Sequence, residues 1–214
     1  MVRKIKHYLM GKSREKKFQL FLTVTKPSQN ATLLDVGVAD REYSPFDNYL
    51  EKKYPYRGNL TALSIYPLEE FRTRYPDVKV VTYNGGKFPF RDKQFSIAFS
   101  NAVIEHVGDF NKQVFFVREL ARIGEKFFFT TPAKAFPIEL HTNYPLVHWL
   151  AKSSFDKSVK WLGKGWASGD YMNLLSLRTL QRLLKASGLT EFRIYTHKLC
   201  FLPLHYSVYG RELA

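Results

Sequence analysis

Two short pairs of carboxylate and imidazole side chains are the residues of this sequence best suited to chemistry. They are Glu105 with His106 and Glu139 with His141, and each pair follows a short apolar run. Imidazole exchanges protons near neutral pH, and a neighbouring carboxylate can orient it. We therefore predict acid–base catalysis or substrate hydrogen bonding by these four side chains. Binding of a divalent metal and simple pinning of a loop are the alternative interpretations.

The elements that must position these pairs are strands that alternate with helices. This alternation predicts an α/β domain with a doubly wound, parallel sheet. In such a sheet the carboxyl ends of the central strands form the ligand-binding edge, so both pairs should lie there. The apolar runs predicted as strands are 32–37, 60–65, 77–83, 95–100, 127–132, 191–196 and 202–209. The predicted helices are one that Ser44 and Pro45 open, 68–75, 109–123 and one from about 175 to 187.

The composition fits one domain with a sizeable core. The chain has 214 residues, of which 45% are hydrophobic, and this content argues against disorder. A single cysteine, Cys200, excludes a disulfide framework and a cysteine zinc site. We expect a basic helical segment at 1–26 and the main domain at 27–214. Within it, 145–172 should form a substrate-side insertion or lid.

The net charge of +14 favours an anionic partner, although solubility alone would also account for it. Nucleic acid, an anionic membrane surface and an anionic small molecule are the candidates. No run reaches the ~18–20 apolar residues that span a bilayer, and basic residues interrupt the N-terminal stretch where a signal peptide would need an apolar core. The expectation is a cytoplasmic protein with peripheral membrane contact as an option.

A longer motif surrounds the first carboxylate and imidazole pair. It contains Asn84, then Phe88-Pro89-Phe90, Asp92, Phe95-Ser96, and finally Glu105-His106-Val107. This stretch resembles the small, single-domain class I S-adenosylmethionine-dependent methyltransferases, and the resemblance extends over roughly residues 30 to 210. It implies a Rossmann-like, doubly wound, seven-stranded sheet with helices on both faces and an antiparallel last strand. It also implies S-adenosylmethionine as the cofactor.

The first predicted strand ends in a sequence that resembles the glycine-rich cofactor motif of this family. Asp35 and Gly37 match the pattern, whereas Ala39 and Arg41 stand at its second and third glycines. The glycines of that motif let the backbone approach the amino-acid part of the cofactor. Arg41 would therefore rim the cofactor pocket or neutralise the cofactor's carboxylate.

Other cofactor contacts carried over from the resemblance have lost their charge here. Ser64 stands where the family has an acid that binds the ribose hydroxyls, and Asn84 where it has an aspartate facing the adenine. A neutral partner makes a weaker hydrogen bond, so cofactor binding should be weakened but not lost. Further residues predicted to line the same pocket are Ile65, Gly85, Gly86, Asn101 and Ala102.

Some related methyltransferases carry a metal-binding Glu-x-x-Glu-His pattern on the helix after the fourth strand. In this sequence Ala102 replaces the first glutamate, so the pattern is incomplete. We therefore predict no metal ligand, and His106 or His141 is the candidate base. Glu105 and Glu139 complete the predicted catalytic set.

Two basic segments could contact the substrate or a surface. The segment 1–26 contains lysines, arginines and apolar residues, and 152–170 interleaves lysines with Trp161 and Trp166. Each could lie on an anionic membrane or against RNA. A helix or lid that packs on its own domain is the alternative for both segments.

The resulting prediction is a methyltransferase that acts on a small-molecule or glycan/lipid-linked acceptor. One alternative is a methyltransferase-like binding or scaffold protein, which the changes at Arg41, Ser64 and Asn84 motivate. Another is an RNA methyltransferase, which the charge motivates. The sequence lacks the Asn/Asp-Pro-Pro-aromatic motif that base N-methylation uses, since Thr131 to Lys134 reads Thr-Pro-Ala-Lys.

Overall fold

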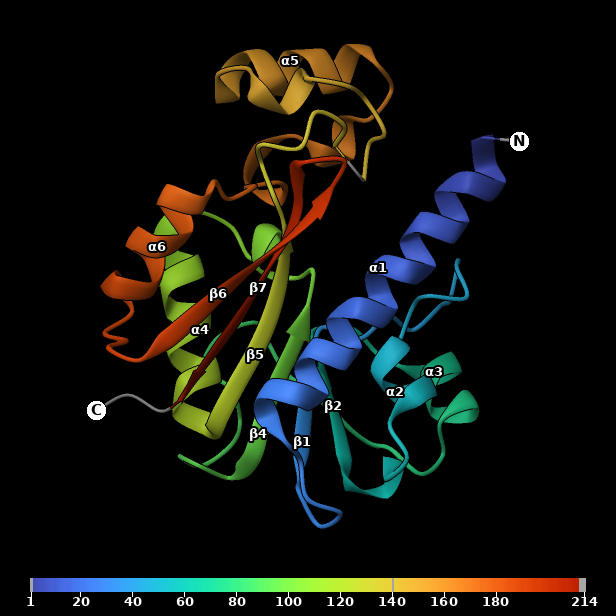
Figure 1. Ribbon diagram of the computed structural model, residues 1–214, viewed down its shortest axis with the longest axis vertical. Coiled ribbons are helices and arrows are strands. Elements are labelled where there is room, and N and C mark those ends of the chain that lie inside the picture. The colour runs from blue at the N-terminus through green and yellow to red at the C-terminus, as the bar shows by residue number, and fades with distance from the viewer. Residues whose placement is uncertain (1, 140, 212–214) are drawn as a thin grey trace. The chain divides into compact units, whose positions relative to one another are not determined.

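The computed structural model describes residues 2–139 and 141–211, with side chains from residue 11 onward in the first helix (Figure 1). Seven strands form one sheet in the order β3-β2-β1-β4-β5-β7-β6. The strands are β1 (Leu33–Val36), β2 (Leu60–Ser64), β3 (Lys79–Thr82), β4 (Phe95–Asn101), β5 (Gly124–Pro132), β6 (Phe192–Leu199) and β7 (Leu202–Arg211). The helices are α1 (Val2–Thr25), α2 (Tyr49–Lys53), α3 (Glu69–Arg74), α4 (Phe110–Ile123), α5 (Lys152–Trp161) and α6 (Leu177–Ala186). The predicted sheet with its antiparallel last strand is confirmed.

The chain divides into two compact units. The first contains residues 1–100, 119–128 and 209–212, and the second contains 101–118 and 129–208. Among the described residues, no helix is long and apolar enough to cross a membrane.

The first unit is built on parallel strands in register. Leu33 of β1 pairs with Leu60 of β2 and with Ile97 of β4. Both faces of these strands are buried, which explains why they are continuous apolar runs in the sequence. Because the strands are parallel and aligned, β1, β2 and β3 end at one edge, with Ser64 paired to Thr82.

Helix α1 packs against this part of the sheet (Figure 1). Phe18 and Phe21 are buried in the core of the first unit, and the ring of Phe21 makes edge-to-face contacts with Phe99 and Phe128. The apolar side of the helix from Phe18 to Thr25 is therefore already covered. This agrees with the alternative in which the segment 1–26 packs on its own domain. A helix that lay on a membrane would need a free apolar face, and from Phe18 to Thr25 that face is buried in the core.

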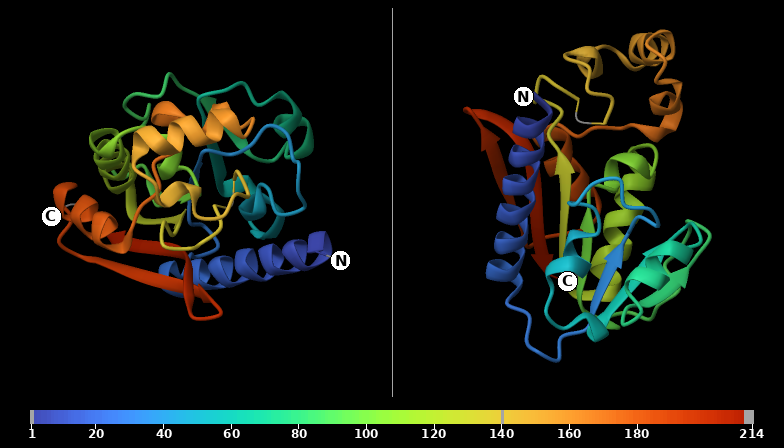
Figure 2. Two further views of the ribbon diagram at one scale, coloured as in Figure 1. Left: turned by 90° about the horizontal axis from the view of Figure 1, so that it is seen from above. Right: turned by 90° about the vertical axis from the view of Figure 1, so that its right-hand side faces the viewer.

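The second unit carries α5 beyond the end of β5, on the side where β7 starts (Figures 1 and 2). Phe155 and Val159 of α5 pack with Ala167 and Met172 in a small core of their own. Ser176 is the N-cap of α6, and its side chain accepts a hydrogen bond from the backbone N–H of Thr179. The last helix is thus positioned by local capping as well as by its buried leucines.

Two local predictions were wrong. Ser44 and Pro45 do not open a helix, because the carboxylate of Asp47 accepts the backbone N–H groups of Tyr43 and Ser44 and holds a turn there; α2 starts only at Tyr49. The spacing of apolar residues in the predicted helix 109–123 also places Phe115 on its core face, but Phe115 is 45% exposed and Phe116 is buried instead. The other residues of that face are buried as the spacing predicts: Val114, Val117, Leu120 and Ala121.

Candidate functional site

The cofactor-side residues of the first unit lie where β1, β2 and β3 end. Gly37 follows β1 with a φ of 90°, and its N–H donates to the carbonyl of Leu63 at 2.9 Å. A residue with a Cβ is strained at that φ, so only glycine closes this turn without cost. Gly85 has a φ of 84°, and a Cβ there would sit 3.7 Å from the side chain of Ile65. The structure thus gathers Gly37, Ile65 and Gly85 at one strand edge.

The polar residues of this edge use part of their hydrogen-bonding capacity locally. The hydroxyl oxygen of Ser64 accepts the N–H of Tyr66, and its own O–H can still be donated. The side-chain oxygen of Asn84 accepts the N–H of Gly86, which leaves its amide NH₂ as a donor at an exposed position. Ala39 is held by Asn48, whose side-chain amide accepts from its N–H and donates to its carbonyl.

These features fit a bound S-adenosylmethionine. The edge offers two glycine turns that let the backbone approach a ligand, a half-exposed Ile65 as an apolar surface for a ring, and hydrogen-bonding groups on Ser64 and Asn84 for hydroxyls and an adenine. These side chains are neutral, so hydrogen bonds that they would make to the cofactor would lack charge assistance.

Two predicted cofactor residues have other partners in the first unit. The guanidinium of Arg41 lies 2.6 Å from a carboxylate oxygen of Glu70 on α3. The carboxyl of Asp35 is buried, and burial together with the neighbouring Glu51 raises its pKa well above the usual range. Burial likewise raises the pKa of Glu51 to about 7. Arg41 is therefore engaged with Glu70, and Asp35 belongs to a buried carboxyl pair.

Asn101 and Ala102 belong to the second unit. The side-chain oxygen of Asn101 accepts the hydroxyl of Thr130, and the N–H of Ala102 donates to the Thr130 carbonyl. Ala102 has a φ of 58°, in the left-handed region where a residue with a Cβ is strained. The chain therefore turns sharply between β4 and the 3₁₀ turn Ile104–His106 that carries the first carboxylate and imidazole pair.

The second unit brings the two carboxylate and imidazole pairs together. The Nε2 atoms of His106 and His141 lie 3.3 Å apart, and the two rings meet edge to face. One carboxylate oxygen of Glu105, Oε1, lies 3.9 Å from Nε2 of His106 and 4.0 Å from Nε2 of His141. The predicted convergence of Glu105, His106, Glu139 and His141 is therefore present in the structure.

A short loop fixes His141 through Glu139. The carboxylate of Glu139 accepts the N–H groups of His141 and Thr142 and also lies 2.8 Å from Nδ1 of His141. Burial alone would raise the pKa of Glu139, but the hydrogen bonds from His141 and Thr142 outweigh it and lower that pKa to about 2. Glu139 is thus an ionised anchor for the second imidazole.

Three neighbours of the pairs were not identified from the sequence. The backbone carbonyl of Tyr171 lies 3.0 Å from Nδ1 of His106, and the Tyr171 ring lies beside the imidazole. The hydroxyl of Thr131 donates to Oε2 of Glu105, and the N–H of Asn173 donates to the Glu105 carbonyl. Thr131 ends a predicted strand and could have been suspected, whereas no spacing links residues 171–173 to position 106.

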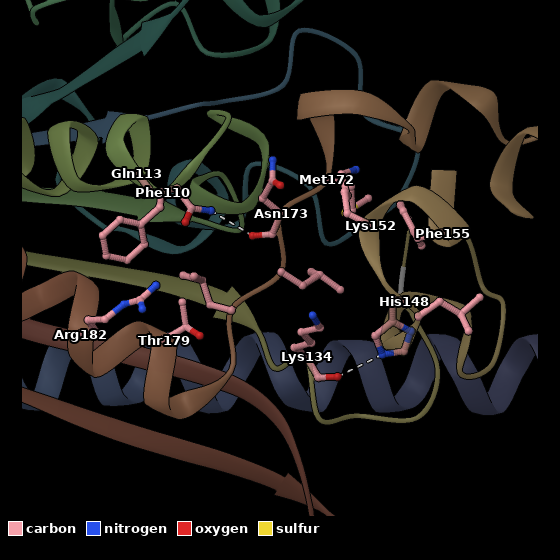
Figure 3. Close-up of a pocket in the computed structure, with 13 residues that line it drawn as sticks. Phe110, Gln113, Lys134, His148, Lys152, Phe155, Met172, Asn173, Thr179 and Arg182 are labelled. Atoms are coloured by element: carbon pink, nitrogen blue, oxygen red, sulfur yellow. Dashed lines mark hydrogen bonds between the residues drawn. The ribbon is translucent and has the colours of Figure 1, made fainter. Parts of the chain in front are cut away.

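A pocket of ≈ 270 Å³ adjoins this cluster within the second unit (Figure 3). Asn173 lines it, and the side chain of Gln113 bridges the carbonyls of Ile104 and Asn173. Apolar surface comes from Phe110, Phe155, Met172, Leu150, Leu174 and Leu175. The remaining lining residues are Lys134, Lys152, Arg182, His148 and Thr179.

The charge of this pocket is positive. Lys134, Lys152 and Arg182 contribute three cations, and none of the described lining residues is acidic. Lys152 is partly neutralised by Asp156 at 2.8 Å, and the guanidinium of Arg182 lies 4.7 Å from the ring centre of Phe110. His148 is buried, with its Nε2 near the carbonyls of Lys134 and Phe136. An apolar cleft with a cationic rim suits a small amphiphilic anion.

Comparison with known proteins agrees with this architecture. Residues 34–126 match the family model of a methyltransferase domain. Similar solved structures include YcgJ from Bacillus subtilis, with 13% identity, 94% of this chain and 99% of that chain covered, and a TM-score of 0.57. Another is a SAM-dependent methyltransferase from Aquifex aeolicus, with 16% identity, 90% of this chain and 87% of that chain covered, and a TM-score of 0.55. A third is a SAM-dependent methyltransferase from Methanosarcina mazei, with 14% identity, 87% of this chain and 94% of that chain covered, and a TM-score of 0.54.

A search of curated proteins found no significant match. At these identities the solved structures show a shared fold, and the family model adds the match to the segment that holds Gly37, Ser64, Asn84 and His106. The cofactor implied by both is S-adenosylmethionine. Residues 34–126 of this chain therefore match a methyltransferase domain, and the chain shares its fold with S-adenosylmethionine-dependent methyltransferases.

Proposed function

We propose that this protein transfers a methyl group from S-adenosylmethionine to a small, anionic or lipid- or glycan-linked acceptor. The observation that carries the proposal is the positively charged, partly apolar pocket that adjoins the histidine cluster through the segment 171–173. Tyr171 contacts His106 through its carbonyl, while Met172 and Asn173 line the pocket. An acceptor held in the pocket would therefore have a neighbouring group able to take its proton.

In this proposal the first unit binds the cofactor. The strand edge with Gly37, Ser64, Ile65, Asn84 and Gly85 binds the cofactor mainly through backbone approach and neutral hydrogen bonds. The bound cofactor supplies the electrophilic methyl group. The second unit then supplies acceptor binding and proton removal, so that the nucleophile is unprotonated when it attacks.

The proposed roles in the second unit follow from its hydrogen bonds. Glu139 orients His141, and the Tyr171 carbonyl orients His106, so both rings present Nε2 to the same space. Lys134 and Arg182 attract the anionic part of the acceptor. The apolar residues of the pocket contact its hydrocarbon part.

Radiolabelled S-adenosylmethionine tests the proposal. The protein is incubated with a small-molecule and lipid extract, and the methylated product is isolated and identified. Once the acceptor is known, Arg182→Ala should raise its KM about tenfold because one cation is lost from the pocket. Lys157→Ala, at an exposed position of α5 outside the pocket, is the matched control and should leave the KM unchanged.

The result against the proposal would be tight cofactor binding with no labelled small molecule or lipid. Label transferred to RNA in a parallel incubation with RNA would support the nucleic-acid alternative. Absence of cofactor binding in a folded sample would support the scaffold alternative.

A further inference from the structure

We propose that Glu105, His106 and His141 form a binding site for one divalent transition-metal ion. The first step of the argument is the state of each imidazole. Nδ1 of His106 faces a backbone carbonyl, which can only accept a hydrogen bond. Nδ1 of His141 faces the Glu139 carboxylate, which also accepts from two backbone N–H groups. Each Nδ1 therefore carries the ring hydrogen.

It follows that both Nε2 atoms present a lone pair to the same space. They lie 3.3 Å apart, a distance at which two lone pairs repel unless a cation or a shared proton stands between them. Two imidazoles whose Nδ1–H groups bind a carbonyl and a carboxylate are also the arrangement that metal-binding histidines use, because these outer contacts fix the tautomer and the ring orientation.

The third ligand is Oε1 of Glu105. Glu105 is fully buried, and Oε2 accepts the hydroxyl of Thr131. Oε1 receives no hydrogen bond from the part of the chain that the structure describes, yet it points toward both imidazoles. A buried carboxylate oxygen without a donor is costly, and a bound cation would remove that cost.

The distances fit one ion. Separations of 3.3, 3.9 and 4.0 Å between the three atoms define a point about 2.2 Å from all of them, within ~0.2 Å of ordinary zinc–nitrogen and zinc–oxygen bond lengths. That point lies in the plane of the three atoms, which leaves coordination positions above and below it. Two imidazoles and one carboxylate favour zinc, iron, cobalt or nickel over magnesium or calcium.

The use of this ion in catalysis rests on the proposed function, whereas its binding does not. An acceptor oxygen that coordinates the ion would have a lowered pKa and could lose its proton at neutral pH. His106 and His141 would then act as ligands in place of acting as bases. The incomplete sequence pattern, with Ala102 at the first glutamate, hides the site because His141 comes from a loop 35 residues away.

Cobalt binding to the tag-free full chain tests the site directly. Titration with Co²⁺ should give one equivalent of bound ion, visible by its d–d absorption, and Zn²⁺ should displace it. His141→Ala and Glu105→Gln should each weaken binding at least tenfold, and the glutamine retains an oxygen that can accept from Thr131. His205→Gln is the matched control, a histidine outside the cluster, and should bind Co²⁺ like the unmodified protein.

Circular dichroism melting curves show whether the variants fold. If His141→Ala fails to fold, Glu105→Gln alone decides. Absence of stoichiometric Co²⁺ and Zn²⁺ binding, or equal binding by Glu105→Gln, would overturn the site. Metal binding without methyl transfer would leave the site standing and count against the proposed function. Methyl transfer that is unchanged after a chelator has removed the metal would leave the proposed function standing and would remove the ion from catalysis; only the binding titrations decide whether the site exists.

Discussion

The cofactor-side edge of the first unit and the histidine cluster of the second unit are built in different ways. The edge with Gly37, Ser64 and Asn84 relies on backbone geometry and on side chains that are neutral; Gly37 and Asn84 are exposed there, whereas Ser64 is buried. The cluster with Glu105 and His141 is largely buried and relies on charged side chains fixed by hydrogen bonds. Substitutions should therefore affect binding of the cofactor at the edge and the chemical step at the cluster.

His106→Ala should have the largest effect of the substitutions considered, and it should act on turnover and not on cofactor binding. Whether His106 takes the acceptor's proton or holds a metal ion, its loss removes the activation of the nucleophile, and turnover should fall about 10²–10⁴-fold. The dissociation constant for S-adenosylhomocysteine should change less than twofold. Turnover is measured with radiolabelled cofactor, and binding by calorimetry. Unchanged turnover would remove His106 from the mechanism.

Gly37→Ala, in the first unit, should instead weaken cofactor binding. A φ of 90° costs a residue with a Cβ about 1–2 kcal/mol, so the turn shifts and cofactor affinity should fall about tenfold. Gly58→Ala is the matched control, because a Cβ there meets open space and no left-handed φ is required. Calorimetry compares the two variants. Equal affinities would mean that the turn at Gly37 does not approach the cofactor.

Glu51→Gln tests the buried carboxyl pair below the edge. The pKa of Glu51 is about 7 in the folded state against 4.5 ordinarily. The folded state therefore binds more protons between these values, and the free energy of unfolding should fall as the pH rises from about 4.5 through 7. The loss should be on the order of 3 kcal/mol. Asp35, whose pKa is also raised, contributes in the same direction.

Urea unfolding at several pH values measures this dependence. The glutamine carries no titrating proton, so its stability should vary less over the same range. A variant with the same slope as the unmodified protein would place the pH dependence elsewhere.

Arg41→Ala should have the smallest effect. The guanidinium is mostly exposed and paired with Glu70, and such surface pairs contribute little because solvent screens them. Cofactor affinity should change less than threefold in calorimetry. A tenfold loss would show that Arg41 leaves Glu70 and binds the cofactor's carboxylate, as the sequence alone suggested.

The sequence predicted the alternation of strands and helices well, because buried parallel strands are apolar along their whole length and helices carry caps such as Ser176. It misplaced the start of α2, since the turn held by Asp47 uses the same residue types as a helix N-cap. It placed the two carboxylate and imidazole pairs at the ends of two strands.

The finer geometry of the site was beyond the reach of sequence. The 3.3 Å contact between His106 and His141 depends on how the loop around Glu139 folds. The contact between His106 and the Tyr171 carbonyl joins residues that are 65 positions apart in the sequence. The pairing of Arg41 with Glu70 depends on how α3 packs. None of these has a local signature.

The most direct test of the account is a calorimetric titration of the purified protein with S-adenosylhomocysteine, performed in parallel on His141→Ala. The account predicts micromolar binding by both, because the neutral edge of the first unit holds the cofactor without help from the histidine cluster. No binding by the folded protein at millimolar ligand would contradict it.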